Sequence, residues 1–457
     1  MEKIEKKSVK KKRRINWQKI FCFMSLIFIL VCIFWYGGRF IYFYKESEKT
    51  LTEESNMFAR VVKTQNHDSE TFKQVGQDYY FYGNVLNNYV SYSNRLWRII
   101  KVNKDNSIVL VTDNVIGTLA YGNSDTDYQN SNLFSWLNVN EEEPNSGVFE
   151  RTLNEKEKYL VKNSTCIDNV DDVENVTCEK VYDDGYLGLL SVWDYIYTGS
   201  NKGFIHNERY SYLSNQNENK EIWYVNDEGK LDISSGEDIL GIKATITLSP
   251  TLELKNGTGT SDDPYYFEDS NGLIGSYVKL DSDIWRIYEE KNGIVKLILE
   301  SIIVSEDETD SSNKFQHRYS KSSYYHNDTI YGSLAYYLNR DFYNSLGYNS
   351  LILENTYVNG FYGNDNDYLY DDINQKTIET KVAIPSINDV LWNDTLDNYF
   401  TDTGISENSS LVYVRKEKGL VTSKNVTAES YVVPCISISK DNLKVGSGSF
   451  EDPYRTE

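Results

Sequence analysis

The sequence is poor in the residues on which metal and redox enzymes usually depend. Its 457 residues include five cysteines and four histidines, and the histidines show no regular spacing (His67, His206, His317 and His326). It has no Ser-His-Asp order with a G-x-S-x-G segment, no H-E-x-x-H pair and no P-loop. The commonest hydrolase and nucleotide-binding motifs are therefore excluded, although the many carboxylates leave a glycosidase pair open.

Positive charge is scarce as well. The chain has 47 Lys and Arg against 68 Asp and Glu, a formal net charge of −21, so a phosphate polymer would be repelled. We therefore expect no nucleic acid among its partners. At 40% hydrophobic and 14% aromatic residues the chain is too apolar to stay disordered, and its length allows two or three packed domains.

The charge is distributed unevenly along the chain. Residues 1–19 carry a net charge of +7, which leaves −28 for the rest. The segment from Ile20 to Gly38 is uncharged and long enough to cross a bilayer as a helix. It runs on into bulky aromatic residues such as Tyr36 instead of the small residues of a signal-peptide cleavage site. We therefore predict a single-pass cell-membrane protein, with a cytoplasmic tail at 1–19, a transmembrane helix at 20–44, a stalk at 45–74 and an extracellular remainder.

Beyond the stalk the chain repeats itself at a shift of roughly 190 residues. Four pairs of segments match in the same order: Trp97–Ile99 with Trp285–Ile287, Ser131–Asn138 with Ser333–Asn339, Leu189–Asp194 with Ile384–Asp389, and Leu254–Tyr265 with Leu443–Tyr454. We predict two homologous domains, the first repeat at 75–268 and the second repeat at 269–457.

Local patterns predict an α+β fold for each repeat. Residues 89–102 are rich in β-branched and aromatic residues, which is typical of a β-meander. Short helices are expected to begin at Ser131 and Ser333. Ser191 and Ser386 each open an S-x-x-D pattern, which is typical of a helix cap. Late strands are expected at 222–225, 242–248, 411–414 and 431–438.

The order of these motifs resembles a family of uncharacterised surface domains of Bacillota, which often stand behind one transmembrane helix. The motifs are Trp-Arg-Ile on a strand, a Ser-started helix ending in Leu-Asn, a Gly turn (Gly229, Gly419) and a closing strand with Pro434. That family is similar to the C-type-lectin-like fold shared with formylglycine-generating (sulfatase-modifying) enzymes. The resemblance implies two tandem C-type-lectin-like domains. The first repeat departs from the pattern at Ala244-Thr245, where an Arg-Pro-like pair is expected.

Cys166 and Cys178 are the first candidate pair of functional residues. Eleven residues separate them, and outside the cytoplasm such a pair can oxidise to a disulfide worth about 3 kcal/mol. Resembling proteins often carry a cysteine pair in this loop. Free thiols remain the alternative, whereas the spacing is not that of a zinc site. Cys435 is interpreted as a core residue.

The closing segments of the repeats form the second candidate, with carboxylates at Asp262, Asp263, Glu451 and Asp452. Several oxygen ligands in one loop are compatible with calcium. Glycines followed by Asp-Pro also build a tight turn, and we favour the turn. No other metal or cofactor is expected, and no catalytic residue is assigned.

Taken together, the sequence predicts a non-catalytic binding or adhesion protein on the surface of a Gram-positive-like cell. Tandem copies of one fold gain avidity from joint engagement of a ligand. The expected partners are the lipid bilayer and a surface glycan, envelope polymer or protein. Two alternatives stay open: a formylglycine-generating-like or wall-acting enzyme, and a structural spacer or assembly subunit of the envelope.

Overall fold

The computed structural model describes residues 57–303, 333–359 and 377–457, except for short gaps at 123–125, 144, 175–176, 394–395, 406–409, 417, 419 and 429. Residues 57–457 form one compact unit. The predicted tail and the predicted transmembrane helix at 20–44, which contains Ile20 and Tyr36, lie outside the described residues. Within the described ranges, no helix has the length and apolar character needed to cross a membrane. The structure therefore gives no support to the predicted single-pass membrane protein.

The predicted fold class, α+β with C-type-lectin-like domains, is wrong. The described part of the chain is mostly β, with 36% strand and 16% helix. Helices begin at three of the four predicted serines (Ser131, Ser191 and Ser333), whereas the residues after Ser386 form only a turn. Of these helices, α3 (Asn132–Leu137) and α5 (Val192–Tyr197) each have only six residues. Helices of fewer than two turns connect strands and cannot form a layer of their own.

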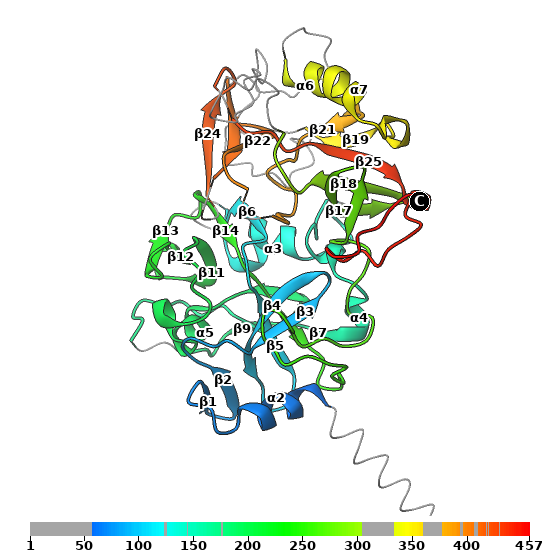
Figure 1. The fold of residues 1–457 in the computed structure, drawn as a ribbon. Helices are drawn as coiled ribbons and strands as arrows, with labels where there is room; N and C mark the ends of the chain where they lie inside the picture. Colours follow the sequence, from blue (N-terminus) through cyan, green and yellow to red (C-terminus); the bar gives the residue numbers. More distant parts are fainter. Residues whose placement is uncertain are drawn as a thin grey trace, which may run out of the picture. The chain divides into compact units, whose positions relative to one another are not determined.

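The first repeat is built on an eight-stranded antiparallel sheet with the order β1-β2-β4-β5-β15-β10, to which β3 and β7 add at β4 and β15 (Figure 1). Its strands are β1 (Phe72–Val75), β2 (Asp78–Phe81), β3 (Tyr89–Tyr92), β4 (Arg95–Val102), β5 (Ile108–Thr112), β7 (Leu160–Val161), β10 (Leu187–Leu189) and β15 (Ala244–Leu248).

The second repeat has a five-stranded sheet with the order β16-β17-β18-β25-β21. It matches β3-β4-β5-β15-β10 strand for strand, and both sheets have a register shift at the same place, after Ile99 and after Ile287. The strands are β16 (Tyr277–Leu280), β17 (Asp283–Lys291), β18 (Ile294–Leu299), β21 (Val382–Ala383) and β25 (Cys435–Ser439).

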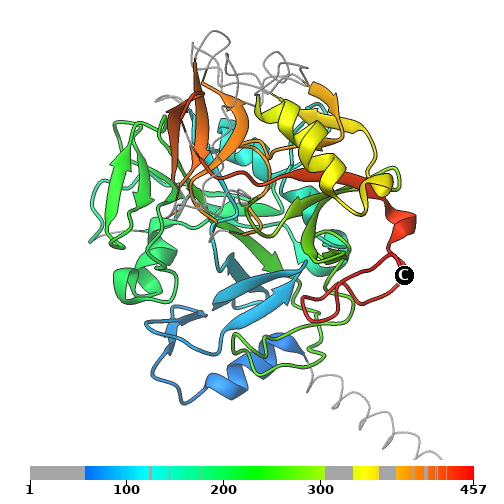
Figure 2. The ribbon, with the colours of Figure 1, turned by 45° about the horizontal axis from the view of Figure 1, so that its top comes forward.

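Each repeat adds a three-stranded sheet, and the one of the second repeat is orange in Figure 2. These strands are β11 (Ser211–Gln216), β12 (Ile222–Val225) and β13 (Leu231–Ser234), and β22 (Tyr399–Gly404), β23 (Leu411–Arg415) and β24 (Val421–Asn425). Three strand pairs complete the described sheets: β6 (Gly117–Ala120) with β14 (Ile239–Ile242), β8 (Thr165–Cys166) with β9 (Val181–Tyr182), and β19 (Asn355–Val358) with β20 (Thr377–Thr380).

The remaining described helices are short. They are α2 (Phe58–Asn66), α4 (Lys156–Tyr159), α6 (Leu334–Tyr337), α7 (Tyr343–Ser345), the π-helical η4 (Leu338–Phe342), and the 3-10 turns η1 (Tyr128–Asn130), η2 (Glu150–Thr152), η3 (Ser200–Lys202), η5 (Asn349–Leu351) and η7 (Lys440–Asn442). Helix α2 and strand β1 fall within the predicted stalk at 45–74. They do not stand apart from the fold, because Phe58 and Val62 are buried in the core of the first repeat.

The same asparagine brace holds each short helix against its sheet. Asn138, at the end of α3, donates its side-chain amide to Leu187 O at 3.1 Å and accepts from Leu187 N at 3.0 Å. Asn339 in the second repeat makes the same pair of bonds with Val382 O and Val382 N, both at 2.9 Å. The predicted equivalence of the Leu-Asn motifs is therefore expressed in identical hydrogen bonds.

The two repeats meet through residues 386–392 of the second. Trp136, fully buried, donates its indole N–H to Asn388 O at 2.9 Å. Leu391 N donates to Ile116 O at 2.8 Å, and the Arg95 guanidinium lies 3.6 Å from the centre of the Trp392 ring. Because this segment belongs to the core that the first repeat forms, the repeats do not have separate interiors.

Substitution of either brace residue tests the equivalence of the repeats. Asn138→Ala and Asn339→Ala each remove two hydrogen bonds to one backbone unit and should lower the free energy of unfolding by about 2 kcal/mol. Urea unfolding measures the change. Asn219→Ala, at an exposed loop position, is the matched control and should change little. The loss at Asn339 should be the larger one, because its side-chain oxygen also accepts from the Thr380 hydroxyl at 2.8 Å. A loss at only one of the two positions would show that the motif has different roles in the two repeats.

Candidate functional site

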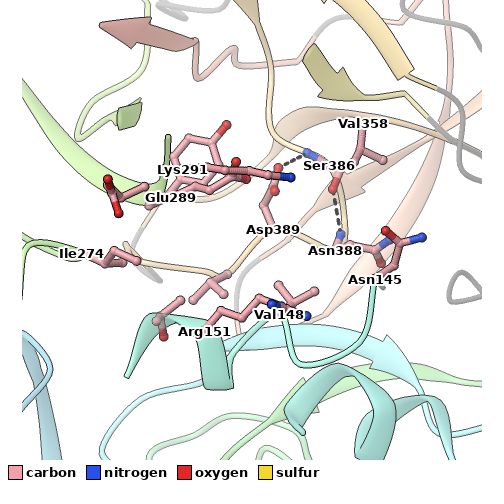
Figure 3. Close-up of a pocket in the computed structure, with 14 residues that line it drawn as sticks. Asn145, Val148, Arg151, Ile274, Glu289, Lys291, Val358, Ser386, Asn388 and Asp389 are labelled. Atoms are coloured by element: carbon pink, nitrogen blue, oxygen red, sulfur yellow. Dashed lines mark hydrogen bonds between the residues drawn. The ribbon is translucent and has the colours of Figure 1, made fainter. Parts of the chain in front are cut away.

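A cavity of 440 Å³ lies where the second repeat meets the first (Figure 3). Three segments line it: the end of β17, the loop at 386–390, and the first-repeat loop that contains Asn145 and Arg151. Ile274 and Val358 complete the wall. Polar residues from both repeats therefore line the same cavity.

A second cavity of 420 Å³ adjoins the first and shares four lining residues with it (Asn145, Glu289, Lys291 and Val358). Lys296, Asn355 and Tyr357 are among the residues that line only this second space. Because the two cavities share walls, they form one continuous cleft.

One wall of the cleft is the edge of a strand. Four consecutive residues of β17 line the first cavity, from Tyr288 to Lys291. Successive side chains of a strand point to opposite faces, so four in a row are reached only along the edge. On this side, β16 pairs with β17 only at Asp283–Arg286, and Gly275 and Ser276 bond Ile287. Beyond Ile287 no described strand pairs with that edge.

Asn388 presents an unsatisfied amide in the wall of the cavity. The residue is 7% exposed, and neither its side-chain nitrogen nor its oxygen has a hydrogen-bond partner in the described structure. A buried amide without partners costs about 1–3 kcal/mol, so such a group is uncommon in a folded protein. A ligand that both accepts and donates a hydrogen bond would satisfy it.

The backbone around Asn388 is held in place from several sides. Asn388 N donates to Ser386 Oγ at 3.1 Å, and Ser386 N donates to Asp389 Oδ2 at 2.6 Å (Figure 3). Arg415, buried in β23, donates through Nη2 to Ser386 O, Ile387 O and Asp389 O at 3.2, 2.9 and 2.8 Å. The unsatisfied amide is thus mounted on a rigid loop.

Two carboxyl groups lie at and behind this loop. Burial raises the pKa of Asp389, which lines the cavity. Asp402 on β22 is 1% exposed, and burial together with the nearby Asp389 raises its pKa far above the ordinary value. Burial likewise raises the pKa of the Cys435 thiol, in agreement with its interpretation as a core residue.

In the first repeat, side chains of the repeat itself occupy the space that corresponds to the cavity at Asp389. Asp194 occupies the position of Asp389, and it accepts from Lys101 Nζ at 3.1 Å and from the Tyr80 hydroxyl at 3.0 Å. Tyr80 reaches it because β2 pairs with the edge of β4, with Tyr80 opposite Lys101. The register after the bulge places Glu289 of β17 at the position of Lys101. The second repeat therefore lacks a lysine at this position. The charges of Lys296 and Arg415 act on Asp389, but within the described residues neither forms an ion pair with it, and no described strand covers the edge.

The two cysteines that were expected to pair form a disulfide in the structure, with a Cα–Cα distance of 5.8 Å. They join the loop around β8 and β9, away from the cleft-lining residues. Asp168 lies close to both sulfurs, but its carboxylate accepts from the backbone N–H groups of Glu179 and Lys180. Since disulfide sulfurs are not thiolates, this group is a poor metal site.

The closing segments form the same turn in both repeats. Asp263 accepts from Thr258 N at 3.0 Å through its carboxylate, and Asp452 accepts from Ser447 N at 2.9 Å. Gly257 and Gly446 adopt φ of 106° and 103°, a region that favours glycine. Both carboxylates that close the turns are occupied by backbone donors, whereas Asp262 and Glu451 point to the exposed side of the turn. The structure brings none of these four carboxylates to the cleft.

The cleft and its residues were not predicted from the sequence. Asp389 was interpreted only as a helix cap, and Asn388 carried no signal of its own. Asp402 carried no clear signal either, because its strand Tyr399–Gly404 has the sequence YFTDTG, and the full burial of that strand is visible only in the structure. Charged residues are seldom fully buried, so such a residue indicates a special environment.

Comparison with known proteins gives no relative on which to base a function. No family model matches the chain, and no curated protein or solved structure matches it significantly.

The buried carboxyl group of Asp402 makes stability depend on pH. Because its folded-state pKa is raised, its contribution is full below the pKa of the unfolded chain and is lost as pH rises toward the folded-state value. Asp402→Asn cannot ionise, so its free energy of unfolding should rise relative to that of the wild type as pH rises. The full gain is about 1.4 kcal/mol for each unit by which folding raises the pKa of Asp402.

Urea unfolding at several pH values between about 5 and 8 measures this difference. Asp262→Asn, in a solvent-facing turn, is the control. A gain for Asp402→Asn that is the same at every pH would contradict the assignment of a buried, protonated carboxyl group.

Proposed function

We propose that this chain is a non-catalytic binding protein whose ligand site is the cleft between the two repeats. The observation that carries the proposal is the Asn388 amide, which is buried, held rigidly and without a partner in the cavity wall. An unsatisfied buried amide destabilises the free protein, and a ligand that forms hydrogen bonds with it would offset this loss.

The composition of the cleft supports binding by hydrogen bonds. Its polar lining residues are amides, hydroxyls and charged groups (Asn145, Asn355, Asn388, Ser386, Thr356, Glu289, Lys291, Arg151 and Lys296). Glu289 and Lys296 already pair with each other at 3.1 Å, so together they add no net charge to the cleft. They can still orient a ligand through hydrogen bonds. A polar surface ligand fits this lining better than an apolar metabolite.

The disulfide supports an extracytoplasmic location, because cysteine pairs of this kind persist in oxidising compartments. The repeats support a binding role in a way that differs from the avidity expected from sequence. In the first repeat, Tyr80 and Lys101 cover the carboxylate of Asp194. In the second repeat, the equivalent carboxylate, Asp389, lines an open cavity. The first repeat thus acts as the support and supplies one wall of the site.

Asn388→Ala tests the proposal without a penalty for the fold. The amide makes no side-chain bond in the free protein, so its removal should leave stability unchanged or slightly raised. The full chain is screened against a glycan array and against a library of random peptides. We expect saturable binding to at least one of them, weakened about tenfold by Asn388→Ala, a loss of about 1.4 kcal/mol.

Asn219→Ala is the matched control, since Asn219 is exposed and lines neither cavity. Isothermal titration calorimetry gives the affinities. Binding that Asn388→Ala leaves unchanged, or silence in both screens, would contradict the proposal.

A further inference from the structure

We propose that the ligand is an extended peptide segment, which adds as a strand to the open edge of β17 and places a basic side chain against Asp389. The inference rests on the proposed function and specifies its ligand class. Its basis is the internal comparison of the repeats, which shows the same edge once occupied and once open.

In the first repeat the occupant of this edge is the chain itself. Strand β2 pairs with the far end of β4, with Tyr79 opposite Val102 and Tyr80 opposite Lys101. The Tyr80 hydroxyl then reaches Asp194 at 3.0 Å and receives the Trp193 indole N–H at 3.3 Å. A four-residue strand is therefore enough to close the space over the carboxylate.

In the second repeat β17 has the corresponding edge at Glu289–Lys291, and the cavity lies along it. An exposed strand edge carries unpaired backbone donors and acceptors and accepts an extended peptide readily. The Asn388 amide, across the same cavity, suits a peptide unit, which offers one donor and one acceptor. The strand edge and the Asn388 amide can both form hydrogen bonds with the backbone of a peptide. This favours a polypeptide over a glycan as the ligand.

The charge at the site indicates the side chain that the peptide brings. Lys101 lies 3.1 Å from Asp194 in the first repeat, whereas the equivalent residue of the second repeat is Glu289. Asp389 therefore lacks the lysine that its counterpart has. The charges of Lys296 and Arg415 act on Asp389, but Lys296 pairs with Glu289, and no described cation forms an ion pair with Asp389. A Lys or Arg of the incoming strand takes the position that Lys101 has in the first repeat.

The test uses the full chain and random peptides about eight residues long, enough for a strand of ordinary length. Peptides that bind are resynthesised in two forms, with N-methyl groups on alternate amides in one register or in the other. Strand addition uses the amides of one register only. We expect one form to lose about tenfold or more in affinity and the other to bind as before.

Charge recognition is tested with Asp389→Asn and with norleucine in place of the peptide's basic residue. Each change should weaken binding, and the two together should cost no more than one, because they remove the same interaction. The outcomes are distinguishable. Equal effects of the two methylation registers, or binding to glycans alone that depends on Asn388, would overturn the strand proposal and leave the proposed function standing. Silence in both screens would overturn both.

Discussion

The docking of residues 386–392 onto the first repeat is the contact on which the rest of the molecule depends. The indole of Trp136 holds Asn388 by its carbonyl oxygen, and the guanidinium of Arg95 lies flat on Trp392. Cation–π contacts of this kind gain strength when they are removed from water. Because Asn388 is fixed through its backbone, its unpartnered side-chain amide is held in the wall of the cavity. The same contact therefore joins the repeats and builds the site.

The two repeats share one fold but differ at one position in it: the strand edge beside the shared carboxylate is covered in the first repeat and open in the second. The sheets share strand order, bulge position, helix cap and asparagine brace. They differ where Lys101 becomes Glu289 and where the first repeat adds β1 and β2. In the first repeat the Asp194 carboxylate accepts from a cation and a hydroxyl. In the second, Asp389 has neither of these two partners and accepts from the backbone of Ser386.

Much of the frame could be predicted from the sequence, because it depends on local pattern. The helix starts at Ser131, Ser191 and Ser333 are confirmed, since each side chain accepts from a backbone N–H of its own first turn. Strand β12 was predicted to the residue, and β15 and β25 lie within or close to predicted strands. The α+β assignment failed because capping patterns mark where a helix begins and not how far it runs.

The cleft could not be predicted, for a different reason. Its walls come from residues near 150, 290 and 388, and only tertiary packing brings them together. The unsatisfied state of Asn388 is a property of the whole arrangement. The equivalence of Lys101 and Glu289 could be predicted once the repeats were aligned. Its consequence depends on β2, which has no counterpart among the described strands of the second repeat.

Amide hydrogen exchange of the free protein tests the central claim, that the second repeat has an open strand edge where the first has a closed one. Exchange is slow where a backbone N–H is paired and covered, and fast where it opens to solvent at little cost. The account predicts faster exchange in the segment 288–291 than in the equivalent segment 100–102, which β2 covers. Equal protection of the two segments would contradict it, because the edge of β17 would then already be occupied.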